Sequence, residues 1–451
     1  MTSERPLRHV AVLTLGCKLN LAESENWALE LRRRGIAVSD RPVAADAYII
    51  NSCSVTHVAD RKSRHLVRLA RRLAPEATVV LTGCFAESAG PRASELGADL
   101  LVANAEKAAA VRRLLELRPT TPVVGASTAH RTRAFVKAQE GCNDVCAFCI
   151  VPRTRGRERS RAPAEVVREV CSREDEGYRE VVITGTQLGA WGRDFLLPAR
   201  PADLIRAVLE ESTVPRVRFS SLQPQDIGDE LLALWQDPRL CRHFHLALQS
   251  GCDATLRRMR RRYSIAQYAE ALARIRVAVP DVAVTTDVMA GFPGESDAEF
   301  AESLAFCRQA GFAGMHVFPY SRRPGTTASL LPGHLPSLEV RARVALLLQE
   351  AERSARDFRG RFVGRMLPAL WEQRVSRPNG RAAWEGLTDN YLRVRVETDA
   401  DLGGRVTAVR LVRDEGDALL AVPVEAGAEV GGVPCAPRAV SRLSSPAASC
   451  W

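Results

Sequence analysis

The sequence of 451 residues has no apolar run near the roughly 20 residues that a membrane-spanning helix requires. Its apolar runs, such as Tyr48–Ile50 and Val79–Leu81, have the length of buried strands. The stretch Val10–Leu15 contains Thr14 and is not followed by a small-residue cleavage site, which argues against a secretion signal. These absences predict a cytoplasmic protein without a membrane partner, whose thiols stay reduced.

Lysine is scarce, since only four of the 63 basic residues are lysine, at a formal net charge of +10. A GC-rich genome favours arginine without any functional reason, so this excess alone does not indicate a nucleic-acid partner. The sequence also lacks a Walker loop and a dinucleotide-binding glycine motif. Its eight histidines form no ligand pattern. The positions at which arginine and cysteine cluster are therefore the informative features.

The composition is otherwise that of a soluble globular protein, with 46% hydrophobic and 26% charged residues. One hydrophobic core rarely serves more than about 250–300 residues, so the length predicts two or three domains. In residues 1–125, strand-sized runs alternate with helical patterns at Glu23–Arg34 and Asp60–Leu73. This order predicts a doubly wound α/β domain, and the Pro- and Thr-containing segment 118–134 predicts a linker.

Residues 135–355 repeat the alternation of strands and helices. The pattern predicts a full or partial α/β barrel with catalytic groups at the carboxyl ends of its strands. The strand candidates are Val181–Thr184, Val217–Phe219, His245–Leu248, Val282–Thr285 and Gly314–Phe318, with helices such as Pro163–Glu176 and Ala266–Val277 between them.

Near residue 360 the pattern changes to short strands joined by Gly- and Asn-containing turns, with no long helix between them. We expect a small all-β module over residues 360–425 and a flexible tail over 431–451. The strands expected in the module are Leu367–Trp371, Leu392–Val396, Val406–Val412 and Leu419–Val424. The fold class predicted for the chain is therefore α/β with a small C-terminal β module.

Three of the 12 cysteines lie within eight residues, in the spacing Cys142-x3-Cys146-x2-Cys149. Three thiolates can hold one soft metal centre. A structural zinc site usually needs a second Cys-x2-Cys pair or histidines at a suitable distance, and none follows. A 4Fe-4S cluster held by three thiolates leaves one iron without a protein ligand, and this open iron can bind a cofactor.

Three further cysteines each follow a strand-sized run: Cys17 ends VAVLTLGC, Cys53 ends YIINSC and Cys84 ends VVLTGC. Parallel strands of a doubly wound sheet end on the same side, so these cysteines can converge although they are far apart in sequence. The convergence predicts a second 4Fe-4S cluster with one open iron. The alternative is three unrelated buried thiols, since free cysteine is often buried.

The loop spacing, with Phe148 directly before the third cysteine, resembles that of the radical S-adenosylmethionine (SAM) superfamily. Two three-cysteine sets in this order resemble its methylthiotransferase family, and the resemblance covers nearly the whole chain. The segments that carry it are TLGCKLNLAESE, NSCSVT, VLTGC, LQSGCD, DVMAGFPGES and FPYSRRPGT. It implies that a cluster on Cys142, Cys146 and Cys149 cleaves SAM to a 5′-deoxyadenosyl radical. It also implies that a second 4Fe-4S cluster donates the sulfur, and that the C-terminal module is similar to the RNA-binding TRAM β-barrel.

The family adds a methylthio group at an unactivated C–H bond, and its branches differ in substrate. The segments SCSVTHVADRKSRH, RMRRRYS, HVFPYSRRPGT and WEGLTDNYLRV look most like the branch acting at C2 of N6-threonylcarbamoyladenosine beside the tRNA anticodon. The other branches act on N6-isopentenyladenosine in tRNA or on a ribosomal-protein aspartate. The implied partners are a tRNA anticodon stem-loop, a low-potential electron donor and a sulfur source. A candidate of another class is a non-catalytic RNA-binding protein with structural zinc.

SAM needs contacts beyond the iron, and the resemblance places them at strand ends. The residues it indicates are Phe148, Gly185, Gln249, Ser250 and Asp287. Gly185 and the glycines near Asp287 are equally compatible with tight turns that touch no ligand. Cys252 stands where the family more often has serine, and we interpret it as a small-residue replacement.

Arginines recur beside the cysteines, where a polyanionic substrate would enter. Phosphate contacts give salt-dependent affinity with little sequence readout, although such runs can also be solvated faces. The RNA-binding candidates are Arg153, Arg155, Arg157, Arg61 and Lys62, and a further run is Arg257, Arg258, Arg260, Arg261 and Arg262. In the C-terminal module, Trp371, Trp384 and Tyr391 can stack on bases or form the core, and for Trp371 we favour the core.

Overall fold

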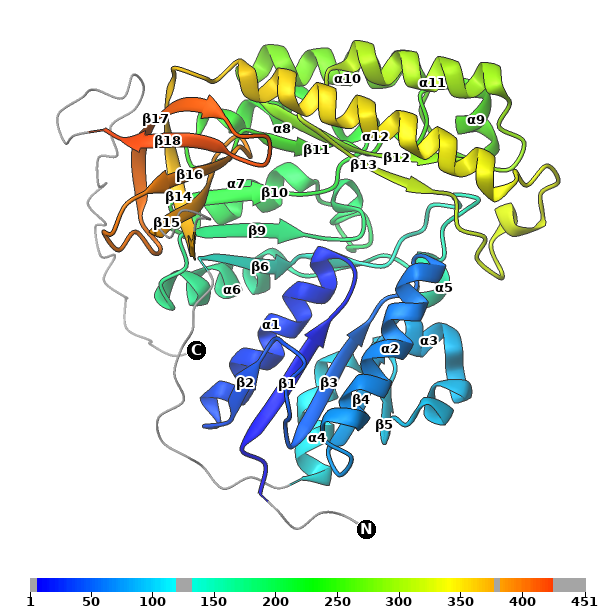
Figure 1. Ribbon diagram of the computed structural model, residues 1–451, viewed down its shortest axis with the longest axis vertical. Helices are drawn as coiled ribbons and strands as arrows, with labels where there is room; N and C mark the ends of the chain where they lie inside the picture. The colour runs from blue at the N-terminus through cyan, green and yellow to red at the C-terminus, as the bar shows by residue number, and fades with distance from the viewer. Residues whose placement is uncertain (1–5, 119–131, 377–381, 425–451) are drawn as a thin grey trace, which may run out of the picture.

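In the computed structural model, which describes residues 6–118, 132–376 and 382–424, the first strands form one parallel sheet (Figure 1). The strand order is β2-β1-β3-β4-β5, with helices on both faces. This confirms the doubly wound N-terminal fold and adds the short strands β2 and β5. The elements are β1 (His9–Thr14), α1 (Lys18–Arg33), β2 (Ala37–Ser39), β3 (Ala47–Ser52), α2 (His57–Leu73), β4 (Thr78–Gly83), α3 (Cys84–Ala89), β5 (Leu100–Val102) and α4 (Ala110–Leu117).

Six parallel strands form the central partial barrel as two sheets, β10-β9-β6 and β11-β12-β13. Isolated bridges Val217↔Leu240 and Leu222↔Leu246 join the sheets, so β6 and β13 are the two open edges. The barrel strands are β6 (Arg133–Lys137), β9 (Glu180–Thr184), β10 (Arg216–Phe219), β11 (His243–His245), β12 (Ala283–Ala290) and β13 (Gly314–Pro319). The α/β barrel prediction is confirmed in its partial form.

Helices cover the outside of the barrel, where alternate strand residues such as Val284 and Val288 are buried in one apolar core. The remaining elements of this part are β7 (Gln139–Glu140), α5 (Val151–Thr154), β8 (Arg159–Ser160), α6 (Pro163–Asp175), α7 (Pro201–Glu211), α8 (Asp229–Ala233), α9 (Asp253–Arg258), α10 (Ile265–Ala278), α11 (Asp297–Ala310) and α12 (Ser337–Gly360). None of the helices within the described ranges is long and apolar enough to cross a membrane.

Three boundaries in the barrel differ from the expectation. Strand β6 begins inside the predicted linker. It was not recognised because only its alternate residues, such as Ala134, are apolar and buried. Strand β11 is His243–His245 rather than His245–Leu248. Strand β12 continues to Ala290, so Asp287 lies within a strand instead of after it. The rest of the linker, 119–131, and the tail, 431–451, lie outside the described residues.

The C-terminal module is a closed barrel in the order β14-β15-β16-β18-β17. Its strands are β14 (Met366–Ser376), β15 (Ala382–Thr388), β16 (Arg393–Glu397), β17 (Val406–Asp414) and β18 (Leu419–Pro423). Strand β15 was not predicted from the sequence, because its residues Trp384–Gly386 include a charge and a glycine. The predicted fold class, α/β with a small C-terminal β module, is confirmed.

The turn between β15 and β16 plugs the amino-terminal end of the central barrel. Arg218 donates to the carbonyl oxygen of Asp389 at 3.0 Å, and Arg242 pairs with the Asp389 carboxylate at 2.6 Å. The ring of Tyr391 stacks on His243 with centroids 4.1 Å apart. Trp371 and Trp384 are buried in the module's core, so neither is free to stack on a base.

Candidate active site

The structure places the N-terminal cysteine triad at the carboxyl edge of the first sheet. Cys53 and Cys84 directly follow β3 and β4, and Cys17 precedes α1 after β1. The thiols of Cys17 and Cys84 lie within electrostatic range of Cys53. The repeated strand-end placement therefore does bring the three side chains to one edge, as parallel topology requires.

Two glycines make this approach possible. Gly16 has φ +97°, and a Cβ there would lie 2.7 Å from both Cβ and Sγ of Cys53. Gly83 has φ +98°, and a Cβ there would lie 2.3 Å from the carbonyl oxygen of Ser52. Any side chain at these two positions would force the strand ends apart, and the left-handed backbone favours glycine independently.

The second triad lies in the loop before α5. The backbone N–H of Cys149 donates to the carbonyl oxygen of Cys146 at 3.1 Å, and the thiols of Cys142 and Cys146 lie within electrostatic range of Cys149. Burial raises the pKa of Cys142 and of Cys149 to about 12, and that of Cys53 to about 11. A soft cationic centre would offset this cost, because thiolates rather than thiols bind metal.

The donor sets fit iron–sulfur clusters better than a single metal ion. In the described ranges, no three Cys, His, Asp or Glu side chains converge as ligands of one ion must. Each cysteine of a cluster binds a different iron atom, so this finding bears on a zinc site and not on a cluster. Each set of three thiols supplies the number of donors that a cluster with one open iron would need.

One member of the 257–262 arginine run contacts the loop triad. Arg261 donates from Nη1 to Sγ of Cys146 at 3.2 Å and from Nη2 to Oε1 of Gln223 at 3.0 Å. Arg258 pairs with Glu299 at 2.6 Å and Arg262 with Asp144 at 3.3 Å. Most of this run is therefore engaged within the protein, and the sequence carried no signal that separated Arg261 from its neighbours.

A cavity of about 180 Å³ lies between the two triads. Cys149 lines it from one side, and Val55 and Thr56, which closely follow Cys53, line it from the other. Its floor comes from the carboxyl ends of the barrel strands. The lining residues are Val55, Thr56, Phe148, Cys149, Ile150, Val151, Gln249, Asp287, Met289, Phe318, Pro319, Tyr320 and Ser321.

Three of the five residues predicted to contact SAM, Phe148, Gln249 and Asp287, line this cavity. Gln249 has φ 67°, and its buried Oε1 has no hydrogen-bond partner among the described residues, as expected of a group that binds a ligand. Gly185 and Ser250 are not among the lining residues. Ser250 is fully buried, and its hydroxyl accepts the N–H of Cys252 at 3.3 Å. The SAM contacts stay predictions.

Glu23 on α1 joins the first domain to the barrel. Its carboxylate pairs with Lys107 at 2.6 Å, with Lys137 of β6 at 3.2 Å and with Arg155 at 3.2 Å. Burial alone would raise the pKa of Glu23, but the three cations hold it well below its usual range. No local sequence pattern predicts this cluster, because its members are distant in the chain.

The position of Arg155 corrects one prediction. Its side chain is 3% exposed, bonded to Glu23 and within electrostatic range of Cys17 and Cys84. It therefore has no surface to offer to RNA and instead contacts the N-terminal domain beside its triad. Arg153 and Arg157 are exposed, as are Arg61 and Lys62 on α2.

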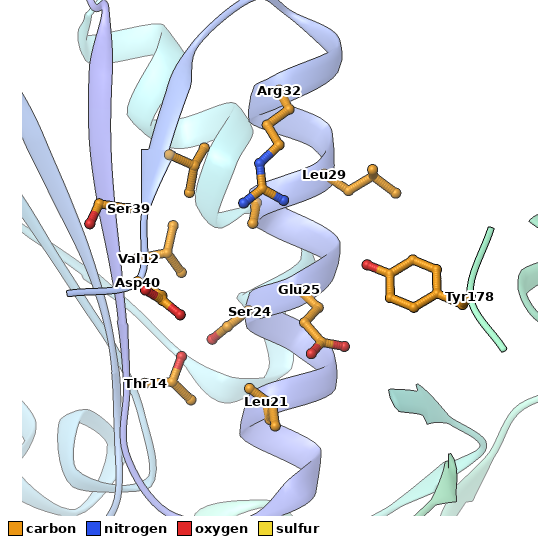
Figure 2. Close-up of a pocket in the computed structure, with 12 residues that line it drawn as sticks. Val12, Thr14, Leu21, Ser24, Glu25, Leu29, Arg32, Ser39, Asp40 and Tyr178 are labelled. Atoms are coloured by element: carbon orange, nitrogen blue, oxygen red, sulfur yellow. The ribbon is translucent and has the colours of Figure 1, made fainter. Parts of the chain in front are cut away.

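A second cavity, of about 370 Å³, lies beside α1. Figure 2 shows Glu25 and Leu29 of that helix and Tyr178 of the barrel facing one another, with Asp40 and Thr14 across the helix. None of the six triad cysteines lines it. It is therefore a groove of the N-terminal domain, bordered by Tyr178 and distinct from the cavity between the triads.

Comparison with known proteins agrees with this arrangement. Residues 136–307 match the radical SAM superfamily, and residues 9–103 match the uncharacterized protein family UPF0004. The chain is 33% identical to the threonylcarbamoyladenosine tRNA methylthiotransferase MtaB of Bacillus subtilis, over 90% of this chain and 94% of that protein. It is 34% identical to the tRNA-2-methylthio-N(6)-dimethylallyladenosine synthase of Acidothermus cellulolyticus, over 90% and 86%.

The fold is similar to that of a solved radical SAM methyltransferase, TsrM from Kitasatospora setae. The TM-score is 0.53 at 15% identity, and the match covers 71% of this chain and 77% of that chain. At this identity the likeness concerns the fold alone.

Proposed function

Since this chain belongs to the methylthiotransferase family of radical SAM enzymes, we propose that it adds a methylthio group to C2 of N6-threonylcarbamoyladenosine in tRNA. A radical SAM domain implies a 4Fe-4S cluster and SAM. The further elements of the proposal are the second cluster, the residues that hold each group and the identity of the nucleoside.

The observation that carries the proposal is the cavity that lies between Cys149 of the loop triad and the segment that follows Cys53. Cys149 and the loop after Cys53 face one space, at the carboxyl ends of the barrel strands. Helix α3, which begins at Cys84, packs against α5, which follows Cys149. A target atom held in this cavity would therefore lie beside Cys149 and the segment that follows Cys53, close to both cysteine sets, as a reaction that uses both requires.

Each set of side chains has a defined task in this proposal. Cys142, Cys146 and Cys149 would hold the cluster that binds SAM, and Cys17, Cys53 and Cys84 would hold the other. When bound, these groups supply a carbon radical that removes the hydrogen at C2 and the methylthio sulfur that replaces it. Phe148 and Gln249 would contact SAM and, with the buried cavity wall, keep water from the reacting carbon.

The exposed cations would bind the tRNA backbone. Arg61 and Lys62 on α2 and Arg153 and Arg157 after the loop triad lie on elements that flank the cavity. Helix α2 is tied to the barrel by Arg323, which pairs with Asp60 at 2.8 Å. A fixed relation between these cations and the cavity would place an anticodon loop over it. An electron donor and a sulfur source complete the proposed partners.

Two nucleosides compete as substrate. The threonylcarbamoyl derivative is favoured by the first two relatives, at 33% and 34% identity, and by the segments of that branch. The dimethylallyl derivative is favoured by relatives of similar identity. Mass spectrometry of tRNA nucleosides from a deletion strain tests the choice. We expect loss of the 2-methylthio form of threonylcarbamoyladenosine with accumulation of its precursor. Loss of only the dimethylallyl product would overturn the assignment.

A further inference from the structure

The interior of the central barrel is polar, unlike its outside. Alternate residues of β11, β12 and β13 pack outward in the apolar core, as Phe244, Val288 and Val317 do. The residues between them face inward and bond to one another. His245 Nε2 lies 3.3 Å from Oδ2 of Asp287, and His316 Nδ1 lies 3.2 Å from Oδ1 of the same carboxylate. Asp287 thus holds an imidazole on each oxygen.

Asp287 connects this chain of side chains to the candidate active site. Its carboxylate lines the cavity between the two triads, as does Phe318. The ring of His316 lies next to Phe318, with centroids 5.3 Å apart. His316 is on the same strand two residues earlier, so it extends the wall of the cavity along β13, the open edge of the barrel.

His316 is the accessible member of the group. Its side chain is 75% exposed, against 20% for His245. Nδ1 is engaged by Asp287, and Nε2 has no hydrogen-bond partner among the described residues. The hydrogen bond to Asp287 raises the pKa of His316, which favours the imidazolium and makes Nε2 a donor. The ring therefore presents a directed N–H to the open edge of the barrel.

The surroundings favour an anion at this place. The ammonium of Lys18, the first residue of α1, lies within electrostatic range of Asp287, Arg133 and Arg218. The carboxylate of Asp287 already bonds both imidazoles, so Nε2 of His316 is the group of this chain left to bind a further carboxylate.

The two candidate substrates differ in whether their N6 substituent carries an anion. The threonylcarbamoyl group carries a carboxylate and a hydroxyl, whereas the dimethylallyl group is a hydrocarbon. We propose that His316, oriented by Asp287, determines specificity by donating a hydrogen bond to the carboxylate of the N6-threonylcarbamoyl group. The inference rests on the proposed function and names a substrate contact for it. A hydrocarbon substituent offers no acceptor to the N–H of His316, so it would lose this contact.

The test is a cycle that changes the residue and the substrate separately. Anaerobically reconstituted wild type and His316→Phe are titrated with anticodon stem-loops that carry threonylcarbamoyladenosine or its neutral methyl ester. A lost charge-assisted hydrogen bond weakens binding on the order of tenfold or more. If His316 contacts the threonylcarbamoyl carboxylate, the His316→Phe change and the methyl ester each weaken binding by this factor. The two changes together then weaken binding little further. Losses that multiply in the combination would overturn the contact.

Two further variants separate recognition from damage to the fold. His316→Gln keeps a side-chain N–H donor and should recover part of the affinity. Val317→Ala alters the opposite face of the same strand, in the apolar core, and should leave the preference for acid over ester unchanged. SAM cleavage without RNA should be equal in wild type and His316→Phe. A loss of SAM cleavage in His316→Phe would contradict a role limited to the nucleoside.

The result also distinguishes a failure of the proposed function from a failure of the His316 contact. If wild type modifies only a stem-loop with dimethylallyladenosine, the proposed function fails and the contact fails with it. If wild type modifies the threonylcarbamoyl stem-loop but His316→Phe retains the full preference for acid over ester, only the contact fails.

Discussion

The two cysteine triads reach similar arrangements by opposite routes. Cys142, Cys146 and Cys149 lie within one loop, so their proximity is fixed by local spacing. Cys17, Cys53 and Cys84 come from three strand ends and meet only when the parallel sheet forms. The first set can be recognised from spacing alone, whereas the second depends on the fold.

The arginines beside the two triads show the same contrast. Arg261, from the barrel itself, donates to Cys146 of the loop triad. Arg155, also from the barrel, crosses to the other domain and lies near Cys17 and Cys84. The N-terminal triad therefore depends on the sheet and on the domain interface. We expect it to be the more fragile of the two.

The largest expected effect comes from Gly16→Ala. The added Cβ would lie 2.7 Å from Cys53 Sγ, so the strand ends must separate. We expect loss of the N-terminal cluster, about half the iron of wild type and no methylthiolated product, with SAM cleavage retained. Gly228→Ala is the control, because a Cβ there meets nothing within 4 Å. Equal iron content in Gly16→Ala and Gly228→Ala would contradict the expectation that the N-terminal triad is the more fragile of the two.

A smaller but global effect is expected from Glu23→Gln. The change leaves Lys107, Lys137 and Arg155 without their shared carboxylate. Removal of one partner of a buried ion pair costs about 3–5 kcal/mol. Thermal unfolding of the protein should show a lower Tm. Glu352→Gln, which breaks an exposed pair with Arg356, should change stability by less than about 1 kcal/mol. Similar decreases in Tm for Glu23→Gln and Glu352→Gln would contradict a stabilising role of the Glu23 cluster.

Arg261→Leu tests the loop triad alone. It removes a hydrogen bond and a positive charge from Cys146, which makes reduction of a bound cluster less favourable. A redox titration followed by electron paramagnetic resonance should give a more negative potential for one cluster and no change for the other. Arg260→Leu, an exposed member of the same run, is the control. An unchanged potential in Arg261→Leu would show that the contact does not act on the cluster.

The smallest effect concerns the surface. Lys62→Ala removes one exposed cation on α2. If it contacts a phosphate, RNA affinity should fall modestly, and the slope of log affinity against log salt should decrease by about 1. Measurements at several salt concentrations would show this. An unchanged slope would place Lys62 outside the RNA interface.

Much of the fold could be predicted because its strands have apolar outer faces and clear turn residues. Strand β6 was missed because only alternate residues are apolar, and β15 because its sequence contains a charge and a glycine. The pairing of Asp287 with His245 and His316 inside the barrel was missed for a related reason. These residues alternate with apolar residues on each strand, and a pattern of this kind in a barrel indicates a polar interior.

The site could be predicted only as far as spacing and strand ends allowed. Arg155 was assigned to RNA because it lies among exposed arginines in sequence, but its partner Glu23 is 132 positions away. No local pattern carries that information. The roles of the six cysteines stay predictions, because geometry establishes their proximity and not their ligands.

The most direct test of the account is the iron and labile sulfide content of the Cys17→Ala, Cys53→Ala, Cys84→Ala triple variant after anaerobic reconstitution. Two clusters predict about eight irons per wild-type chain and about four in the variant, which should still cleave SAM but form no methylthiolated tRNA. Loss of all iron, or no loss at all, would contradict two independent clusters.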